Sequence, residues 1–268
     1  MTKPKRSPDK IISRIVRKVL ARPWLPPAAM MMEARKFVLI FDIVSDTMCP
    51  WCWVGKKNLE FTLKETPEDV DIKNINWLPY FLDLTLSEEG TSTEEYYQKN
   101  YGDARAGERM KPLLISEGRK AGIDFTTYFN ITHFRPTLRS HRLIEYAKQN
   151  GKQEEMVEAL FRMYCEEGKA LNDISALTQV AERIGLNGSN VRAYLQSKSN
   201  EQQVLELARS VRGDHSHGVP TFIFSLCDHK DVTYTLSGAQ PPEVFTNVLE
   251  KLVAHKKRLK RLDQTKKD

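Results

Sequence analysis

The sequence predicts an α/β fold in which a large all-helical insertion separates an N-terminal βαβ unit from a C-terminal ββα unit. Two observations support this prediction. Short apolar, β-branched runs lie near the two ends of residues 37–253, whereas residues 90–212 show helical periodicity punctuated by glycines. The helix between the first two strands implies a right-handed connection between them.

The first unit occupies residues 37–82. Residues 37–44 read FVLIFDIV, an apolar run that is typical of a buried strand. The pattern becomes helical from residue 50 to about residue 64. Apolar residues alternate again over residues 70–82, which predicts a second strand closed by Pro79.

The insertion is predicted to begin with a helix that starts at Thr93, because the acidic residues that follow it favour a helix N-terminus. Further helices are predicted over residues 105–121, 137–149, 153–166, 173–185, 188–197 and 200–212. Glycines fall at or just past several of these helix ends, where the left-handed conformation is needed: Gly122, Gly151, Gly168 and Gly185.

The second unit follows Gly213. Residues 221–226 and 232–236 are predicted strands joined by a turn at 228–231, and an amphipathic helix follows over residues 241–253. Residues 254–268 form a basic tail whose run of charges is typical of a solvated, frayed extension.

The charge distribution argues against nucleic acid as a partner. The chain carries 41 Lys and Arg against 35 Asp and Glu, a net charge of +6. Residues 1–36 alone carry +8 and residues 250–268 carry +5, so the body between them is acidic and unsuited to a polyanion. The composition also excludes a disordered chain. Four cysteines are too few for a disulfide-stapled secreted scaffold. The sequence contains no apolar run of about 20 residues, so no membrane-spanning helix is predicted.

Residues 1–36 form a basic N-terminal extension in which isoleucine and valine recur at helical spacing before a proline-rich break. This pattern is typical of an organelle transit peptide, and a disordered basic extension is the alternative. Translation from within Met30–Met32 would remove the extension altogether. With no secretory signal, we expect an intracellular protein that is cytoplasmic, or mitochondrial or plastidic if the extension is a transit peptide.

Cys49-Pro50-Trp51-Cys52 lies directly after the first predicted strand and opens the first helix. Unpaired N–H groups and the helix dipole favour a thiolate at Cys49, which makes it the predicted nucleophile. Cys52 is then placed to resolve a mixed disulfide. A CxxC motif next to a βαβ unit indicates a thioredoxin-like fold with a redox-active centre.

Half of a zinc site is the alternative interpretation of this cysteine pair. Three histidines lie near Cys227 in the sequence: His215, His217 and His229. No second CxxC and no HxxxH pair completes a ligand set, so no metal is predicted.

Gly218-Val219-Pro220-Thr221 precedes the third predicted strand. In this layout Pro220 is expected to be cis and to lie against the CxxC motif, where the backbone of its neighbour can pair with an extended substrate. An ordinary trans proline at a strand start is the alternative. The predicted substrate-binding residues are therefore Pro50, Trp51, Val219, Pro220 and Thr221.

Asp46 and His141 are candidate auxiliary residues, because either side chain could exchange a proton with a thiol. Turn chemistry is the alternative for Asp46, and a satisfied core or surface position is the alternative for His141. Lys56 and Lys57 are expected to be solvated, and Cys165 is expected in the core. The cluster of Tyr96, Tyr97 and Tyr101 either lines a substrate groove or packs within the helices.

Several runs resemble, in sequence and in order, the DsbA-family thioredoxin-like proteins of the FrnE type: SDTMCPWCWVGKKNLE (45–60), AGIDF (121–125), SHRLIEYAKQNG (140–151), LFRMYCEEGKALND (160–173), GVPTFIF (218–224) and SGAQPPEVF (237–245). The resemblance covers residues 37–253. It implies a thioredoxin fold with a helical insertion, dithiol–disulfide exchange, Cys49 as nucleophile, Cys52 as resolving thiol and Pro220 as the cis-proline. Thr221 stands where the family favours an aromatic residue, which should make the substrate groove smaller and more polar.

The predicted function is that of a thiol–disulfide oxidoreductase acting on protein thiols or small thiols, with no bound cofactor and with glutathione as a candidate co-substrate. Relatives on the same fold leave a glutathione-dependent isomerase or a kappa-class-like glutathione transferase as the alternative, although they usually have serine at the position of Cys49. A redox-regulated chaperone or binding module that uses the insertion as its surface is the second alternative. The sequence indicates no oligomeric state.

Overall fold

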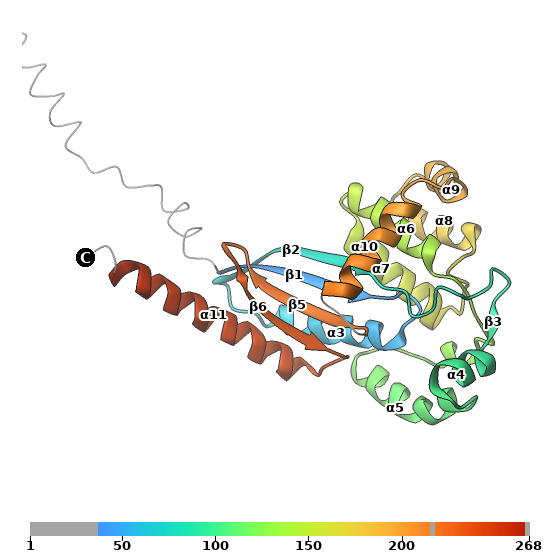
Figure 1. The fold of residues 1–268 in the computed structure, drawn as a ribbon, viewed down its shortest axis with the longest axis horizontal. Coiled ribbons are helices and arrows are strands. Elements are labelled where there is room, and N and C mark those ends of the chain that lie inside the picture. The colour runs from blue at the N-terminus through green and yellow to red at the C-terminus, as the bar shows by residue number, and fades with distance from the viewer. Residues whose placement is uncertain (1–36, 215–217, 266–268) are drawn as a thin grey trace, which may run out of the picture. The chain divides into compact units, whose positions relative to one another are not determined.

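The computed structural model describes residues 37–214 and 218–265 (Figure 1). The predictions for residues 1–36, and for His215 and His217, lie outside the described residues. Within the described part of the chain, no helix is both long enough and apolar enough to cross a bilayer.

A four-stranded mixed sheet forms the centre of the fold. Its strands are β1 (Phe37–Ser45), β2 (Val70–Pro79), β5 (Thr221–Leu226) and β6 (His229–Ser237), in the order β2-β1-β5-β6. β1 is parallel to β2 and antiparallel to β5, and β5 is antiparallel to β6. This is the α/β thioredoxin fold that the sequence predicts. β6 begins at His229, so the turn that precedes it is shorter than predicted.

One face of the sheet is strongly apolar because alternate β1 residues point the same way. Phe41 lies opposite Ile75 of β2 and Phe224 of β5, and all three side chains join one core. Helices α3 (Pro50–Lys64) and α11 (Pro242–Thr265) cover this face (Figure 1). The start of α3 is thereby fixed at the end of β1, where the CxxC motif lies.

The insertion between β2 and β5 is helical apart from one feature that the sequence did not predict. Its helices are α4 (Thr93–Tyr101), α5 (Ala106–Lys120), η1 (Tyr128–Asn130), α6 (Leu138–Gln149), α7 (Gln153–Phe161), the π-helical turn η2 (Arg162–Glu166), α8 (Ile174–Arg183), α9 (Gly188–Gln196) and α10 (Glu201–Asp214). The unpredicted feature is a pair of two-residue strands, β3 (Thr91–Ser92) and β4 (His133–Phe134). Two residues are too short a run to produce a recognisable alternation.

The basic C-terminal segment differs from the frayed tail that its charge predicts. α11 continues through it to Thr265, and the predicted domain boundary at residue 253 falls inside this helix. Lys256 is buried and forms an ion pair with Asp228. The ammonium groups of Lys257 and Lys260 lie over the Phe37 ring, at 5.4 and 5.3 Å from its centroid. Long aliphatic stems let these lysines cover apolar surface while their charges reach solvent.

Candidate active site

Cys49 and Cys52 lie together at the first turn of α3. Cys49 takes an extended backbone conformation at the N-cap position, and Pro50 begins the helix, where its missing N–H costs no hydrogen bond. The Cys49 N–H donates to the Asp46 carbonyl oxygen at 3.0 Å, which turns the chain from β1 into α3. Both cysteines are free thiols with little exposed surface, 5% for Cys49 and 1% for Cys52.

Cys52 is held in its protonated form. Burial raises the pKa of its thiol well above the ordinary value, and the neighbouring Cys49 raises it further. The Ser45 side chain and the Asp46 backbone N–H hydrogen-bond to the Cys52 sulfur and offset only part of this rise. Cys52 therefore needs a proton acceptor before it can attack a disulfide.

The Val219–Pro220 peptide bond is cis, as the sequence predicts, and it lies beside the cysteines. The Cys49 thiol donates to the Val219 carbonyl oxygen at 3.9 Å. Pro220 packs near Gly55 of α3, where an added Cβ would lie 3.3 Å from Pro220 Cγ and 2.9 Å from Phe222 Cζ. A residue without a side chain at position 55 therefore lets the cis-proline loop and β5 approach the active-site helix.

The remaining predicted substrate-binding residues fall into two groups. Pro50 and Trp51 are half-buried at the start of α3, and Val219 is half-buried across from Cys49. Thr221 is buried, and its hydroxyl donates to the Gly218 carbonyl oxygen at 2.8 Å. Thr221 thus contributes to the shape of the loop, and the polar atom that faces Cys49 is the Val219 backbone carbonyl.

Asp46 and His141 are brought together although they are 95 residues apart in the sequence. Asp46 is completely buried, and its carboxylate accepts the backbone N–H groups of Met48 at 3.4 Å and of Leu82 at 2.8 Å. His141 Nε2 lies 3.3 Å from Asp46 Oδ1. The carboxylate therefore fixes both the loop before Cys49 and the orientation of the imidazole ring.

Lys56 is not solvated as predicted, because its side chain is only 1% exposed. Its ammonium forms ion pairs with Glu60 and, at 2.6 Å, with Glu154 of α7. It also lies 5.9 Å from the Trp53 ring and 6.0 Å from the Trp77 ring. Glu154, which belongs to the insertion, compensates the buried charge of Lys56. The sequence of α3 alone does not predict this partner.

The three clustered tyrosines differ in burial: one is buried, one is half-buried and lines a surface pocket, and one is exposed. Tyr96 is buried, and Tyr97 hydrogen-bonds to Tyr128. The exposed Tyr101 has its pKa raised by partial burial and by the proximity of Cys49. Cys165 is buried in η2, as predicted for a core cysteine.

Sequence reasoning missed Ser45 and Gly55. Ser45 is the last residue of β1 and contacts the Cys52 sulfur, whereas Gly55 follows Cys52 by three residues and faces Pro220. The helical periodicity of residues 50–64 places position 55 next to the cysteine face, which is the signal that could have indicated Gly55. Among the side chains that the structure describes, no group of three or more His, Cys, Asp or Glu residues is arranged to hold a metal ion.

Comparison with known proteins gives one family and several relatives. The family model of the DSBA-like thioredoxin domain matches residues 40–250. The uncharacterized protein YwbO of Bacillus subtilis is 25% identical over 182 residues, which are 68% of this chain and 84% of YwbO. The crystal structure of a probable DsbA oxidoreductase from Streptomyces coelicolor matches with a TM-score of 0.69 and 26% identity, over 81% of this chain and 90% of that chain. The cytosolic disulfide reductase DsbM from Pseudomonas aeruginosa, solved with GSH, matches with a TM-score of 0.55 and 16% identity, over 80% of this chain and 99% of that chain.

Proposed function

Because this chain belongs to the DSBA-like thioredoxin domain family, we propose that it is a thiol–disulfide oxidoreductase that works through Cys49 and Cys52. The observation that supports this most directly is the placement of the Cys49 sulfur, which lies at the N-terminus of α3 and faces the Val219 carbonyl. An attacking sulfur needs such a place, where a thiolate is stabilised and a substrate backbone can be held alongside.

The reaction begins with attack of the Cys49 thiolate on one sulfur of a substrate disulfide. A bond forms between the Cys49 sulfur and that sulfur, the substrate S–S bond breaks, and the other substrate sulfur leaves with the electron pair and takes up a proton. Cys52 then loses its proton and attacks the Cys49 sulfur. The Cys49–Cys52 disulfide forms, and the second substrate sulfur leaves as a thiol. The enzyme dithiol is oxidised and the substrate disulfide is reduced; the reverse sequence oxidises a substrate dithiol.

The substrates we propose are protein thiols or small thiols. Half-buried Trp51, two residues after Cys49, provides apolar surface at the redox centre, which suits an extended peptide. Glutathione is the small thiol to test first, because DsbM, which has the same fold, was solved with it. The resemblance of residues 45–60 and 218–224 to the FrnE type supports a place in that branch of the family.

The test measures reduction of insulin and of oxidised glutathione by the reduced protein. We expect Cys49→Ser to abolish both activities, because no thiolate remains to attack. Cys52→Ser should instead trap a mixed disulfide that mass spectrometry detects. Cys227→Ser is the matched control, since Cys227 lies after β5 and away from α3, and it should keep the wild-type rates.

Unchanged activity in Cys49→Ser would contradict the proposal. A glutathione-dependent isomerisation that runs at full rate in Cys52→Ala would assign the chain to the isomerase alternative. Suppression of substrate aggregation by a variant that lacks both cysteines, with no exchange activity in the wild type, would assign it to the chaperone alternative.

A further inference from the structure

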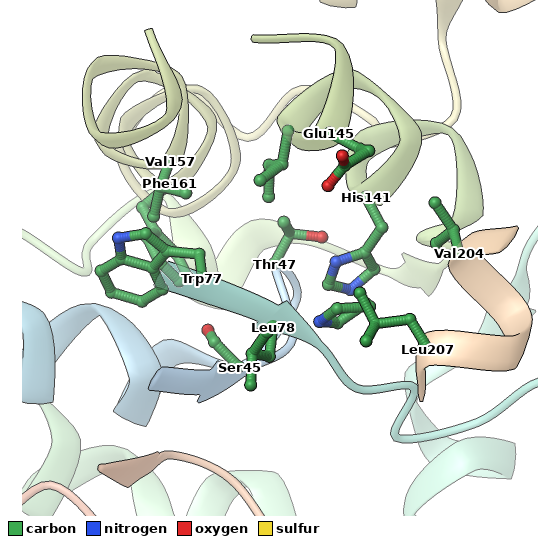
Figure 2. Close-up of a pocket in the computed structure, with 12 residues that line it drawn as sticks. Ser45, Thr47, Trp77, Leu78, His141, Glu145, Val157, Phe161, Val204 and Leu207 are labelled. Atoms are coloured by element: carbon green, nitrogen blue, oxygen red, sulfur yellow. The ribbon is translucent and has the colours of Figure 1, made fainter. Parts of the chain in front are cut away.

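A small cavity lies behind the active site, between the end of β1, the end of β2 and helices α6, α7 and α10 (Figure 2). Its volume of about 20 Å³ is enough for one water molecule. Much of its wall is apolar, and its polar side chains are Ser45, Thr47, His141 and Glu145. A cavity with both apolar and polar walls holds a water molecule only where that water can form hydrogen bonds, and these four side chains provide the partners.

Ser45 connects this cavity to the redox centre. Its side chain lines the cavity and also hydrogen-bonds to the Cys52 sulfur. A hydroxyl can donate and accept at the same time, so it can pass a proton from one side to the other. Cys52, with 1% exposed surface, is thus joined to the cavity through one hydroxyl.

His141 presents a proton acceptor on the opposite side of the cavity. Its Nε2 lies 3.3 Å from the Asp46 carboxylate, so this nitrogen carries the proton that it donates. The other ring nitrogen, Nδ1, is then the acceptor. Figure 2 shows the imidazole ring on the cavity wall, near Thr47 and below the Glu145 carboxylate.

We propose that Ser45, one water in the cavity and His141 form the route by which Cys52 loses and regains its proton. The inference rests on the proposed thiol–disulfide exchange and adds the step that activates the resolving cysteine. Ser45 touches the reacting sulfur and is the catalytic residue of this route. His141 acts through Ser45 and the water and is a positioning residue for the proton, with Asp46 holding its ring.

During resolution of the mixed disulfide, the Cys52 proton passes to the Ser45 hydroxyl while the Ser45 proton passes to the water and a water proton passes to His141 Nδ1. The Cys52 thiolate attacks the Cys49 sulfur, the bond from Cys49 to the substrate sulfur breaks, and that sulfur leaves with the electron pair. The imidazolium returns its extra proton to solvent. In the opposite direction, the same route protonates the Cys52 thiolate as it leaves the Cys49–Cys52 disulfide.

The ionisable groups around His141 must be known before the pH dependence of Cys52 deprotonation can be assigned to this residue. Asp46 from the loop before α3 and Glu145 from α6 are the ionisable groups that face it. The residues that line the cavity from β2, α7 and α10 carry no charge: Trp77, Leu78, Pro79, Val157, Phe161, Val204 and Leu207. Both ionisable neighbours are acids, so the imidazolium that the transfer creates lies beside carboxyl groups and beside no other cation of the cavity wall.

The experiment follows the reaction of the reduced protein with 5,5′-dithiobis(2-nitrobenzoic acid) by stopped flow, in a Cys227→Ser background. The first release of thionitrobenzoate reports attack by Cys49, and its rate depends on reagent concentration. The second release reports attack by Cys52, and its rate does not. Thionitrobenzoate leaves without needing a proton, so the second phase isolates deprotonation of Cys52.

We expect His141→Gln, which keeps a donor for Asp46, to slow the second phase by about 100-fold and to leave the first phase unchanged. The wild-type second phase should rise less steeply with pH than that of His141→Gln, because the imidazole takes up the Cys52 proton. In His141→Gln it should keep rising by about tenfold per pH unit, because Cys52 then loses its proton directly to solvent. A purely structural role for His141 would not change this slope.

His133→Gln is the matched control, because His133 is an exposed histidine of the insertion, and it should match the wild type. Ser45→Ala gives a second test that leaves the Asp46–His141 pair in place, and it should also slow the second phase alone. A wild-type second phase in both His141→Gln and Ser45→Ala, with the wild-type pH profile, overturns the inference. Absence of both phases in the wild type overturns the proposed function instead.

Discussion

At the scale of single residues, the geometry of the redox centre depends on one position that carries no chemistry. Gly55 lies where α3, the cis-proline loop and β5 meet, and its missing side chain leaves room for Pro220 and Phe222. The approach of Val219 to Cys49 depends on that close packing. A residue that reacts with nothing therefore sets how near the substrate-binding backbone lies to the nucleophile.

We predict that Gly55→Ala destabilises the fold by about 1–3 kcal/mol, because its Cβ would lie only 2.9 Å from Phe222 Cζ and one of the two elements must shift. The exchange rate of Cys49 should fall with it. Urea unfolding at pH 7 measures the first effect and insulin reduction the second.

Gly213→Ala is the matched control, because nothing lies within 4 Å of the added Cβ there. In the last turn of α10 it should leave the free energy of unfolding unchanged or raise it by up to about 1 kcal/mol. Equal effects at the two positions would contradict the proposed role of Gly55.

The sequence revealed those parts of the site that are contiguous motifs. Cys49 and Cys52 stand in one motif, and the position of Pro220 before a late strand identified the cis bond before the structure did. The pairing of Asp46 with His141 spans 95 residues, and the contact of Ser45 with Cys52 depends on the turn between β1 and α3. Contacts of this kind form only when distant segments fold together, so no pattern in the local sequence predicts them.

At the scale of elements, the active-site helix is joined to the insertion by a buried charge. Lys56 extends from α3 between the Trp53 and Trp77 rings and pairs with Glu154 of α7, which also accepts the indole N–H of Trp77 at 2.6 Å. Burial alone would lower the pKa of Lys56, but Glu154 and Glu60 outweigh it and raise that pKa. The first turns of α3 thus contact the insertion through Lys56 and the cis-proline loop through Gly55.

We predict that Lys56→Met lowers the free energy of unfolding by about 3 kcal/mol at pH 7, because it leaves Glu60 and Glu154 without their shared cation. Lys57→Met is the control. Its ammonium is more exposed and pairs with Glu60 at 2.7 Å, so its loss should cost about 0.5 kcal/mol. The comparison uses urea unfolding of both variants.

Acidification provides an independent check. The difference between Lys56→Met and the wild type should shrink below about pH 4, where the glutamates become protonated and no longer need a cation. A difference that stays constant down to pH 3 would show that Lys56 stabilises the fold through packing alone.

Elements were predictable where their periodicity was strong and misjudged where tertiary contacts overrode composition. The predicted helices over residues 50–64 and 137–149 agree closely with α3 and α6. The C-terminal segment was misjudged because its lysines suggested a solvated tail. Lys256 pairs with Asp228, and Lys257 and Lys260 cover Phe37, so α11 continues past residue 253.

At the scale of the whole molecule, buried thiol and phenol groups make the free energy of unfolding depend on pH in the alkaline range. Burial raises the pKa values of Cys52, Cys165, Tyr128 and Tyr164 well above their ordinary values of 9.0 for the thiols and 10.0 for the phenols. In the unfolded chain these groups ionise at the ordinary values, whereas the folded protein keeps their protons. The unfolded state then binds fewer protons, so the stability falls as pH rises.

We predict that the urea midpoint is constant between about pH 7 and pH 8 and falls steadily above about pH 9, where the unfolded thiols and phenols ionise. Cys165→Ala should make this fall shallower, because it removes one of the buried protons. Cys227→Ala, at a half-buried thiol near Lys73, is measured beside it as the control for loss of a cysteine elsewhere in the fold. A midpoint that does not change up to pH 10.5 would contradict the prediction.

The insertion and the sheet share one continuous core, which reaches from Phe41 and Phe224 through Trp53 to Phe161 and Leu177. Trp53 stacks on Phe161 at 5.4 Å, and Trp77 of β2 meets the same ring at 6.4 Å. For protein engineering, this means that the insertion is not a removable module. A chimera that combines the strands of this chain with the helices of a relative must exchange both tryptophans and their phenylalanine partner together. The side chains of the sheet layer and those of the insertion are packed against each other in shape and volume.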